Sequence, residues 1–289
     1  MSEQRHPTVT AQSFGSGSSG NALLIRSGDT ALLVDCGVGI RTLRNGLAEH
    51  GLSTHDLDAI LVTHEHGDHV QTLPRLMRRD LPLVATRGTA RAARLPADST
   101  EIISTQHPVS IGNAAVHALS VRHDATEPCG FHIEIAGARI TVLTDLGCWQ
   151  DHLVDAVAAS DLVLLEANYN DTMLRYGPYP AHLKRRVASG VGHLGNDACG
   201  KAMAPVARVR GERMTWWLSH LSATNNSARQ AERDVREELM KADAFANVTA
   251  LPRREPGPVW TFRASDRAPE PRVSIAAPLT GQLGLPGLD

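Results

Sequence analysis

A short polar segment of this chain, residues 63–69, carries four side chains of the types that bind metal ions. They are His64, His66, Asp68 and His69. Imidazole and carboxylate ligands suit zinc, manganese or iron. In an extended segment, side chains two residues apart point the same way, so His64 and His66 can share one ion. A turn at Gly67 then lets Asp68 and His69 face a second ion. The alternative is a solvated polar turn that happens to contain several histidines, but a chance match to this ligand spacing is rare.

Further ligand-type residues follow other apolar runs that have the length of strands. These runs are residues 31–34, 59–62, 140–143, 162–165 and 214–218. Open α/β sheets place their sites at the carboxyl ends of strands. We therefore expect His123 to complete the first ion, His220 to complete the second, and Asp145 to bridge both. Taken alone, each of these three residues could instead be a buried polar residue whose hydrogen bonds are made within the protein.

Two metal ions about 3.5–4 Å apart would share a hydroxide and would stabilise both the attacking and the leaving oxygen of an in-line displacement. The positive charge of such a centre suits an anionic phosphodiester. The candidate ligands thus predict a hydrolytic centre with two divalent ions.

The remaining pattern predicts alternating strands and helices in an α/β arrangement. Hairpins are predicted for residues 8–35, and again between residues 102 and 143 with turns at residues 112–113 and 137–138. One helical stripe ends near Gly51. A second continues from the histidine loop through Val70, Leu73, Leu76 and Met77, and a third begins after Asn226 or Ser227.

Composition limits the function classes. The chain has 289 residues, with 29 basic against 31 acidic side chains, which gives no global electrostatic case for nucleic-acid binding. Its four cysteines form no CxxC pair, so neither a disulfide framework nor a zinc ribbon is indicated. No apolar signal segment follows Met1 and no run is long enough to cross a bilayer. We therefore expect a cytoplasmic protein without membrane contact.

The metal-ligand pattern, His64-x-His66-x-Asp68-His69 with His123, Asp145 and His220, resembles the metallo-β-lactamase superfamily. Further segments are similar to its YycJ/WalJ branch, namely residues 15–21, 123–128, 144–147, 165–168, 192–196 and 219–226. The resemblance implies an α/β fold, a four-layer αββα sandwich with a dinuclear site along one edge. It also implies a 5′–3′ DNA exonuclease. We expect a hydrolase domain at residues 1–264 and a flexible tail at residues 265–289.

Several residues near the ligands are candidates for other roles. By resemblance to RNase Z-like enzymes, His193 could donate a proton to the leaving oxygen or form a hydrogen bond with the scissile phosphate, and the near-neutral pKa of histidine suits either task. Its alternative role is to lead into a helix capped by Asn196. Asp35 and Glu166 are expected to orient metal-bound imidazoles, or else to be turn carboxylates at strand ends.

Substrate and partner contacts are expected from three further segments. In the loop at residues 15–21, Ser18, Ser19 and Asn21 could contact a phosphate backbone, although a simple hairpin connection explains the loop equally well. Lys184 and Arg185 belong to a compact basic cluster, which is otherwise a solvated helix face. In the tail, Gln282, Leu283 and Leu285 resemble the short peptide with which bacterial replication and repair proteins dock on the sliding clamp.

Together these patterns predict a dinuclear metal-dependent phosphodiesterase, a 5′–3′ DNA exonuclease with zinc, manganese or iron. A hydroxide that bridges the ions would attack phosphorus, with Asp68 and His193 as catalytic residues. One alternative is a small-molecule hydrolase of the same fold, acting on cyclic phosphodiesters, thioesters or lactones. Another is a non-catalytic metal-binding scaffold docked on the sliding clamp. The oligomeric state stays open.

Overall fold

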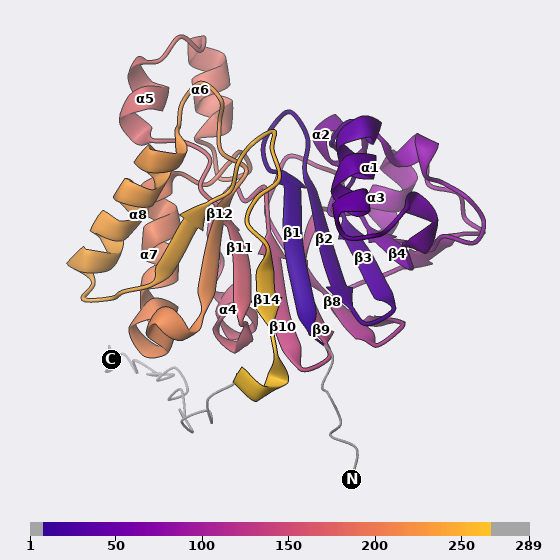
Figure 1. Cartoon of the computed structure of the whole chain (residues 1–289). Coiled ribbons are helices and arrows are strands. Elements are labelled where there is room, and N and C mark those ends of the chain that lie inside the picture. The colour runs from indigo at the N-terminus through magenta and orange to yellow at the C-terminus, as the bar shows by residue number, and fades with distance from the viewer. Residues whose placement is uncertain (1–7, 267–289) are drawn as a thin grey trace, which may run out of the picture.

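Two mixed β-sheets face each other in this computed structural model, which describes residues 8–266 (Figure 1). The first sheet has seven strands in the order β14 (Trp260–Phe262), β1 (Val9–Gly15), β2 (Ala22–Ser27), β3 (Thr30–Val34), β4 (Ala59–Leu61), β5 (Leu83–Ala85) and β6 (Thr100–Ile102). Its strands are antiparallel from β14 to β3 and parallel from β3 to β6.

The second sheet repeats this plan with seven strands of its own. Their order is β13 (Asn247–Ala250), β12 (Thr215–Ser219), β11 (Leu162–Glu166), β10 (Ala138–Leu143), β9 (Cys129–Ile135), β8 (Ala114–Ser120) and β7 (Val109–Ile111). The strands are antiparallel from β7 to β10 and parallel from β10 to β13. The parallel strands therefore end at one edge of the sheet.

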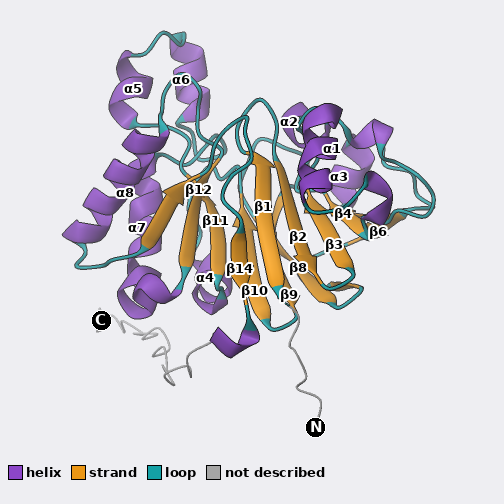
Figure 2. Ribbon diagram, in the orientation of Figure 1, coloured by secondary structure: helices purple, strands orange, loops and turns teal. Residues whose placement is uncertain are grey.

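Helices cover the outer faces of both sheets (Figure 2). On the first sheet lie α1 (Ile40–Glu49), α2 (Gly67–Val70) and α3 (Arg87–Ala92), and on the second lie α4 (Val154–Ala159), α7 (Asn196–Arg210) and α8 (Ala228–Lys241). The remaining helices, α5 (Asp171–Tyr176) and α6 (Ala181–Val187), project together beyond the end of α8 (Figure 1). Short 3₁₀ turns are Thr54–Asp56, Leu73–Arg75, Asp151–Leu153, Gly211–Arg213 and Ala264–Asp266. The predicted αββα sandwich is confirmed.

Strand β11 illustrates how the sequence builds this layering. All of its residues are buried, as expected for a central parallel strand covered on both faces. Leu162 and Leu164 pack in the core between the sheets, whereas Val163 and Leu165 pack toward the helices of the second sheet. The alternation of side chains along a strand thus distributes a continuous aliphatic run over two cores.

The helix predicted after the histidine loop is wrong in its extent. The structure has only the four-residue helix α2, followed by the separate 3₁₀ turn Leu73–Arg75. Pro74 explains the interruption, because it has no backbone N–H for a helical bond to the carbonyl of Val70. By contrast, α8 begins as expected, with the Ser227 side chain accepting from the backbone N–H of Gln230.

Two expectations concern parts of the molecule at its periphery. Among the helices of residues 8–266, none is both long and apolar enough to cross a membrane. The tail predicted at residues 265–289 begins within the 3₁₀ turn Ala264–Asp266, and its remainder lies outside the described residues. The clamp-type peptide, with Gln282, Leu283 and Leu285, lies wholly outside them.

Candidate metal centre

The histidine motif forms the connection from β4 to α2, at the edge where the parallel strands of both sheets end. His66 caps α2, which contains Asp68 and His69. The backbone of this short helix is held by the loops beside it, since the N–H of Asn21 donates to the carbonyl of Asp68 and that of Cys36 to the carbonyl of His69, both at 2.8 Å. The motif is therefore fixed by tertiary contacts, although α2 has only a single turn.

His64, His66 and His123 form the first group of candidate ligands. Each offers a ring nitrogen within 4.8 Å of the others, and the Nε2 of His123 lies 3.2 Å from the Nδ1 of His66. The Nδ1 of His123 donates to the carbonyl of Gly192 at 2.9 Å. That bond leaves the lone pair of His123 on Nε2, the atom that faces the group.

His64 carries the clearest sign of a missing partner. Its Nδ1 lies 3.0 Å from the hydroxyl of Thr63, which itself donates to Asp35. The hydroxyl can therefore only accept from His64, which leaves the lone pair on Nε2. This Nε2 is buried and has no hydrogen-bond partner within the described residues. Because a buried polar atom is normally paired, a cation fits this position.

Asp68, His69 and His220 form the second group. The Nε2 of His220 lies 3.1 Å from the Oδ2 of Asp68, and the Nε2 of His69 lies 3.7 Å from the same oxygen. Behind the rings, the Nδ1 of His69 donates to Asp35 at 2.7 Å, and the Nδ1 of His220 donates to Glu166 at 3.0 Å. The structure thus puts a carboxylate behind each imidazole, the arrangement that orients metal-ligating histidines.

Asp145 lies between the two groups. Its Oδ2 is 3.0 Å from the Nε2 of His69, and its Oδ1 is 3.7 Å from the Nε2 of His123. Burial raises the pKa of Asp145, but the charges of His220 and His69 outweigh it and hold the pKa well below its usual range. Its Oδ1 also lies 3.3 Å from the Nδ1 of His220, so Asp145 has ring nitrogens of both groups within 4 Å.

The charge balance of the cluster also favours cations. Its carboxylates are Asp35, Asp68, Asp145 and Glu166, and within residues 8–266 their ion-pair partners are histidines, without any Lys or Arg. Burial lowers the pKa of His69, but Asp35 and Asp145 raise it to about 10. Buried carboxylates of this kind need positive charge beside them, which protons or metal ions supply. The donor set and the unpartnered nitrogen together fit divalent ions.

His193 lies beside this cluster, in the loop before α7. Its Nδ1 donates to Glu166 at 2.8 Å and lies 3.4 Å from Asp145, while the side chain keeps 20% of its surface exposed. Its Nε2 has no hydrogen-bond partner in the part of the chain that the structure describes. Burial lowers the pKa of His193, but the charge and hydrogen bond of Glu166 raise it above its ordinary value. The ring therefore has a free edge that can carry a proton.

Asn196 does not have the expected capping role. The cap of α7 is Gly195, and the Asn196 side chain is buried and donates to Asp234 at 2.9 Å. The capping expectation is wrong because the buried polar contacts between α7 and α8 engage this amide instead.

The serine-rich loop divides into exposed and buried parts. Ser18 and Ser19 are exposed, whereas Asn21 is only 4% exposed. The Asn21 oxygen accepts from the backbone of Gly17 at 2.8 Å, and its nitrogen donates to the carbonyl of Asp68 at 3.2 Å. Asn21 therefore holds the loop against the motif, in place of the phosphate contact expected for it.

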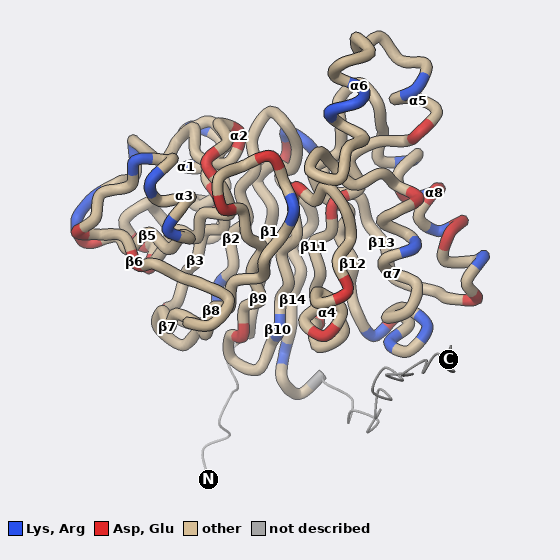
Figure 3. Tube along the Cα trace, turned by 180° about the vertical axis from the view of Figure 1, so that it is seen from behind, with Lys and Arg blue, Asp and Glu red and all other residues tan. Residues whose placement is uncertain are grey.

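The basic cluster on α6 also divides. Lys184 donates to the carbonyl of Arg175 at 2.8 Å, and Arg185 is exposed. Arg186 lies closer to the candidate metal ligands, since it forms an ion pair of 2.6 Å with Asp124, the residue after His123. Figure 3 shows the basic residues of α6 on the projecting helices.

Sequence reasoning missed two residues that organise the centre. Thr63 bonds to Asp35 and His64, and only its place directly before the motif could have pointed to it. Asn168 donates to the carbonyl of His220 at 2.7 Å, a contact across 52 residues that has no local signature. Both residues support the ligands from behind.

Comparison with known proteins agrees with this arrangement. A family model described as a beta-lactamase superfamily domain matches residues 30–217. The exodeoxyribonuclease YycJ of Bacillus anthracis is 34% identical over 232 residues, which cover 78% of this chain and 87% of that protein. The exodeoxyribonuclease WalJ of Streptococcus pneumoniae is 30% identical over 275 residues, 92% of this chain and 96% of that protein. The metallo-beta-lactamase fold protein YhfI of Bacillus subtilis superposes with a TM-score of 0.65 at 18% identity, covering 89% of this chain and 100% of that chain.

Proposed function

Because the chain belongs to the metallo-β-lactamase superfamily, in its YycJ/WalJ-like branch, and is a metal-dependent hydrolase, we propose that it is a 5′–3′ DNA exonuclease with a dinuclear centre. The two relatives named exodeoxyribonuclease support DNA as the substrate. The observation that carries the metal part of the proposal is the buried, unpartnered Nε2 of His64 within a cluster of imidazoles and carboxylates.

In this proposal each ion would have its own set of ligands. His64, His66 and His123 would hold one ion, Asp68, His69 and His220 would hold the other, and Asp145 would contribute to both. Zinc, manganese and iron all suit this donor set. When bound, the ions would supply Lewis acidity, which lowers the pKa of a water molecule so that it can lose a proton at neutral pH and attack phosphorus as hydroxide.

The protein's own groups orient the ligands and deliver a proton. Asp35 and Glu166 hold the Nδ1 atoms of His69 and His220, so that each Nε2 points into the centre. His193 is anchored by Glu166 through Nδ1 and would carry a proton on Nε2. As the bond between phosphorus and the leaving sugar oxygen breaks, that oxygen takes the proton from His193. Asp68 would keep the second ligand set in place during this step.

Contacts to the rest of the DNA strand are proposed for two further segments, the loop between β1 and β2 and helix α6. Ser18 and Ser19 present hydroxyls from the loop between β1 and β2, and Lys184 and Arg185 present charge from α6. Such contacts position a strand through its phosphates without reading its sequence.

One assay tests the proposal. The purified protein is incubated with Mn²⁺ or Zn²⁺ and with single-stranded and duplex DNA labelled at the 5′ or the 3′ end, with RNA, and with bis-p-nitrophenyl phosphate. We expect the label at the 5′ end to be released first. His64→Ala and Asp68→Ala should each reduce cleavage by more than about 100-fold, since even residues behind metal ligands are worth about 10–100-fold. His55→Ala, which removes an exposed histidine, serves as the matched control.

The contradicting results are also specific. Cleavage of DNA that survives in the His64→Ala protein would exclude the metal mechanism. Hydrolysis of the small ester without any cleavage of DNA would assign the protein to the small-molecule hydrolases, and release of the 3′ label first would reverse the polarity.

We also propose that the tail docks on a sliding clamp through Gln282, Leu283 and Leu285. Binding of the full chain to the purified clamp, measured by calorimetry, should be lost in a Gln282→Ala, Leu285→Ala double variant. Val273→Ala, a change elsewhere in the tail, should leave it intact. Equal binding by both variants would contradict the proposal.

A further inference from the structure

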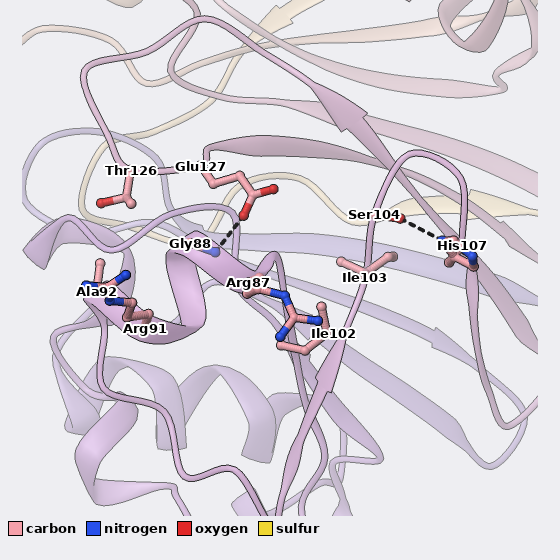
Figure 4. Close-up of a pocket in the computed structure, with 10 residues that line it drawn as sticks. All are labelled: Arg87, Gly88, Arg91, Ala92, Ile102, Ile103, Ser104, His107, Thr126 and Glu127. Carbon is pink, nitrogen blue, oxygen red and sulfur yellow. Dashed lines mark hydrogen bonds between the residues drawn. The ribbon is translucent and has the colours of Figure 1, made fainter.

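A cavity of about 980 Å³ lies beside α3, outside the candidate metal centre (Figure 4). It is lined by Arg87, Gly88, Arg91, Ala92, Ile102, Ile103, Ser104, His107, Thr126 and Glu127. Figure 4 shows α3 on one side, the loop with Thr126 and Glu127 above it, and the loop with Ser104 and His107 across from it. Three separate segments of the chain therefore build its walls.

Two cationic side chains line the cavity. Arg87 and Arg91 are exposed and lie one helical turn apart, and neither forms an ion pair within residues 8–266. Like charges at this spacing disfavour a helix, so an anion in the cavity that both residues line would relieve the repulsion. Guanidinium groups match the geometry of phosphate oxygens in particular.

The lining carboxylate does not cancel this charge by ion pairing. Glu127 accepts from the backbone N–H of Gly88 at 2.5 Å, and its backbone carbonyl accepts from the hydroxyls of Thr86 and Thr89. Glu127 therefore ties its loop to the first turn of α3. Its charge lies at the helix start, where a carboxylate is favourable.

The other walls suit the remaining parts of a nucleotide. Ser104 and His107, which bond to each other at 3.1 Å, offer polar groups at the far side. Ile102 leaves 38% of its surface exposed although it is a large aliphatic residue. An apolar wall beside paired cations is suited to a sugar or base next to its phosphate.

The cavity is connected directly to the metal-binding motif. The backbone N–H and the hydroxyl of Thr126 both donate to the carboxylate of Glu65, at 2.8 Å and 2.5 Å. Glu65 lies between His64 and His66 in the sequence. The loop at residues 124–128 thus separates the candidate scissile position from the two arginines, so a strand that crosses this loop can reach both.

We propose that Arg87 and Arg91 bind a phosphate of the DNA strand outside the scissile bond, with the attached nucleotide against Ile102. This assignment rests on the proposed nuclease function and adds a second substrate contact on the side of α3. The contact is made through a phosphate other than the scissile one, so it recognises a polynucleotide and not a small phosphodiester with a single phosphate. It would hold the strand without regard to its base sequence.

The test uses the metal-loaded full chain with Arg87→Gln, Arg91→Gln and the double variant. Binding of a fluorescent single strand with phosphorothioate linkages, which slow cleavage, is followed by anisotropy over a range of salt concentrations. We expect each single variant to weaken binding roughly fivefold and the double variant roughly twentyfold. The slope of log Kd against log salt should decrease by about 0.7 for each phosphate that the variant no longer binds.

Matched measurements separate this idea from a general loss of function. Arg213→Gln is the control, because it removes an exposed arginine just before the amino end of β12, at the opposite end of that strand from His220. This variant should bind DNA as tightly as the unaltered protein. Turnover of bis-p-nitrophenyl phosphate and the melting temperature should be unchanged in all variants. The KM for DNA should rise with little change in kcat.

Each outcome decides one of the two proposals. Unaltered affinity and salt slope in the double variant, in a protein that degrades DNA, would overturn the role of Arg87 and Arg91 alone. A chain that neither binds nor cleaves DNA would overturn the proposed function and this contact with it.

Discussion

Three residues of the candidate centre have a strained backbone. Asp35, Asp145 and His220 are in the left-handed region with φ of 58°, 51° and 53°, and each lies just beyond the end of a strand. This conformation costs a non-glycine residue about 1–2 kcal/mol. It persists where hydrogen bonds enforce it, as where the N–H of His220 donates to the Ser16 hydroxyl at 2.9 Å. The strain turns each side chain toward the centre.

Asp35 offers a test of the groups behind the ligands. It is 2% exposed and accepts from Thr63 and His69. Asp35→Asn removes the charge that holds His69, so we expect the affinity for Zn²⁺ or Mn²⁺ to fall about 10–100-fold. Competition with a chelator measures it. Asp29→Asn, in the exposed turn between β2 and β3, is the control, and equal affinity in both variants would contradict the assignment.

His132, away from the centre on β9, should make stability sensitive to acid. Burial lowers its pKa although Glu134 raises it. Above the unfolded pKa of about 6.5 both states are neutral, so the group has no effect. Below that pH the unfolded chain binds a proton that the folded protein does not, so stability decreases as pH falls.

His132→Gln should therefore lose less stability than the unaltered protein between about pH 7 and pH 5, by at most about 1.4 kcal/mol per pH unit. Urea unfolding at each pH measures this difference. His55→Gln, at an exposed position, is the control. An equal loss in the His132 variant and the unaltered protein would show that this histidine does not contribute.

At the scale of elements, the position of α2 depends on contacts with neighbouring backbone. A Cβ on Gly37, in the loop after β3, would lie 1.7 Å from the carbonyl oxygen of Asp68. The single-turn helix therefore packs directly on this glycine. Only a residue without a side chain permits that approach, which brings Asp68 and His69 next to the end of β3.

Gly37→Ala should displace α2 and with it the second group of ligands. We expect a loss of about 2–4 kcal/mol in the free energy of unfolding and a weaker affinity for metal, because backbone cannot yield as a side chain can. Gly39→Ala is a matched control two residues away, since its Cβ would meet nothing within 4 Å. Similar stability of the two variants would contradict this account.

At the scale of the whole molecule, the centre joins the two sheets. The first sheet carries Asp35 and the histidine motif, and the second carries Asp145 and His220 at the ends of β10 and β12. The core between the sheets contains side chains of both, such as Leu61 and Val142. Ions held by ligands from both sheets would therefore bind the folded state and not the unfolded chain.

Removal of metal should accordingly lower the melting temperature. Free metal at about 100 times its Kd adds about 2.7 kcal/mol of stability. For a protein of this size that corresponds to roughly 5–10 °C. Scanning calorimetry with a chelator and with added Zn²⁺ measures the shift. His64→Ala should show a smaller shift, and identical melting temperatures of the unaltered protein under both conditions would argue against a metal that bridges the sheets.

Local pattern explains what could be predicted from the sequence. Aliphatic runs such as residues 162–165 have the period and length of buried strands, and the spacing of His64, His66 and Asp68 is a property of a few adjacent residues. The α/β layering and the candidate ligands could be read from such short-range features. The interruption of the helix at Pro74, which the predicted helix did not take into account, has an equally local cause, because a proline inside a helical stripe removes a backbone donor.

Tertiary structure decided which distant residues meet. Parallel pairing of β10, β11 and β12 brings Asp145, Glu166 and His220 to one edge, and no local pattern encodes that register. The burial of Asn21 and the left-handed backbone of Asp35 likewise arise from contacts with segments remote in sequence. The cavity lined by Arg87 and Arg91 also arises from such contacts, because three separate segments build it. Sequence by itself determined the ligand types, whereas long-range burial and strand pairing determined their partners, because packing energy depends on the whole fold and not on neighbours along the chain.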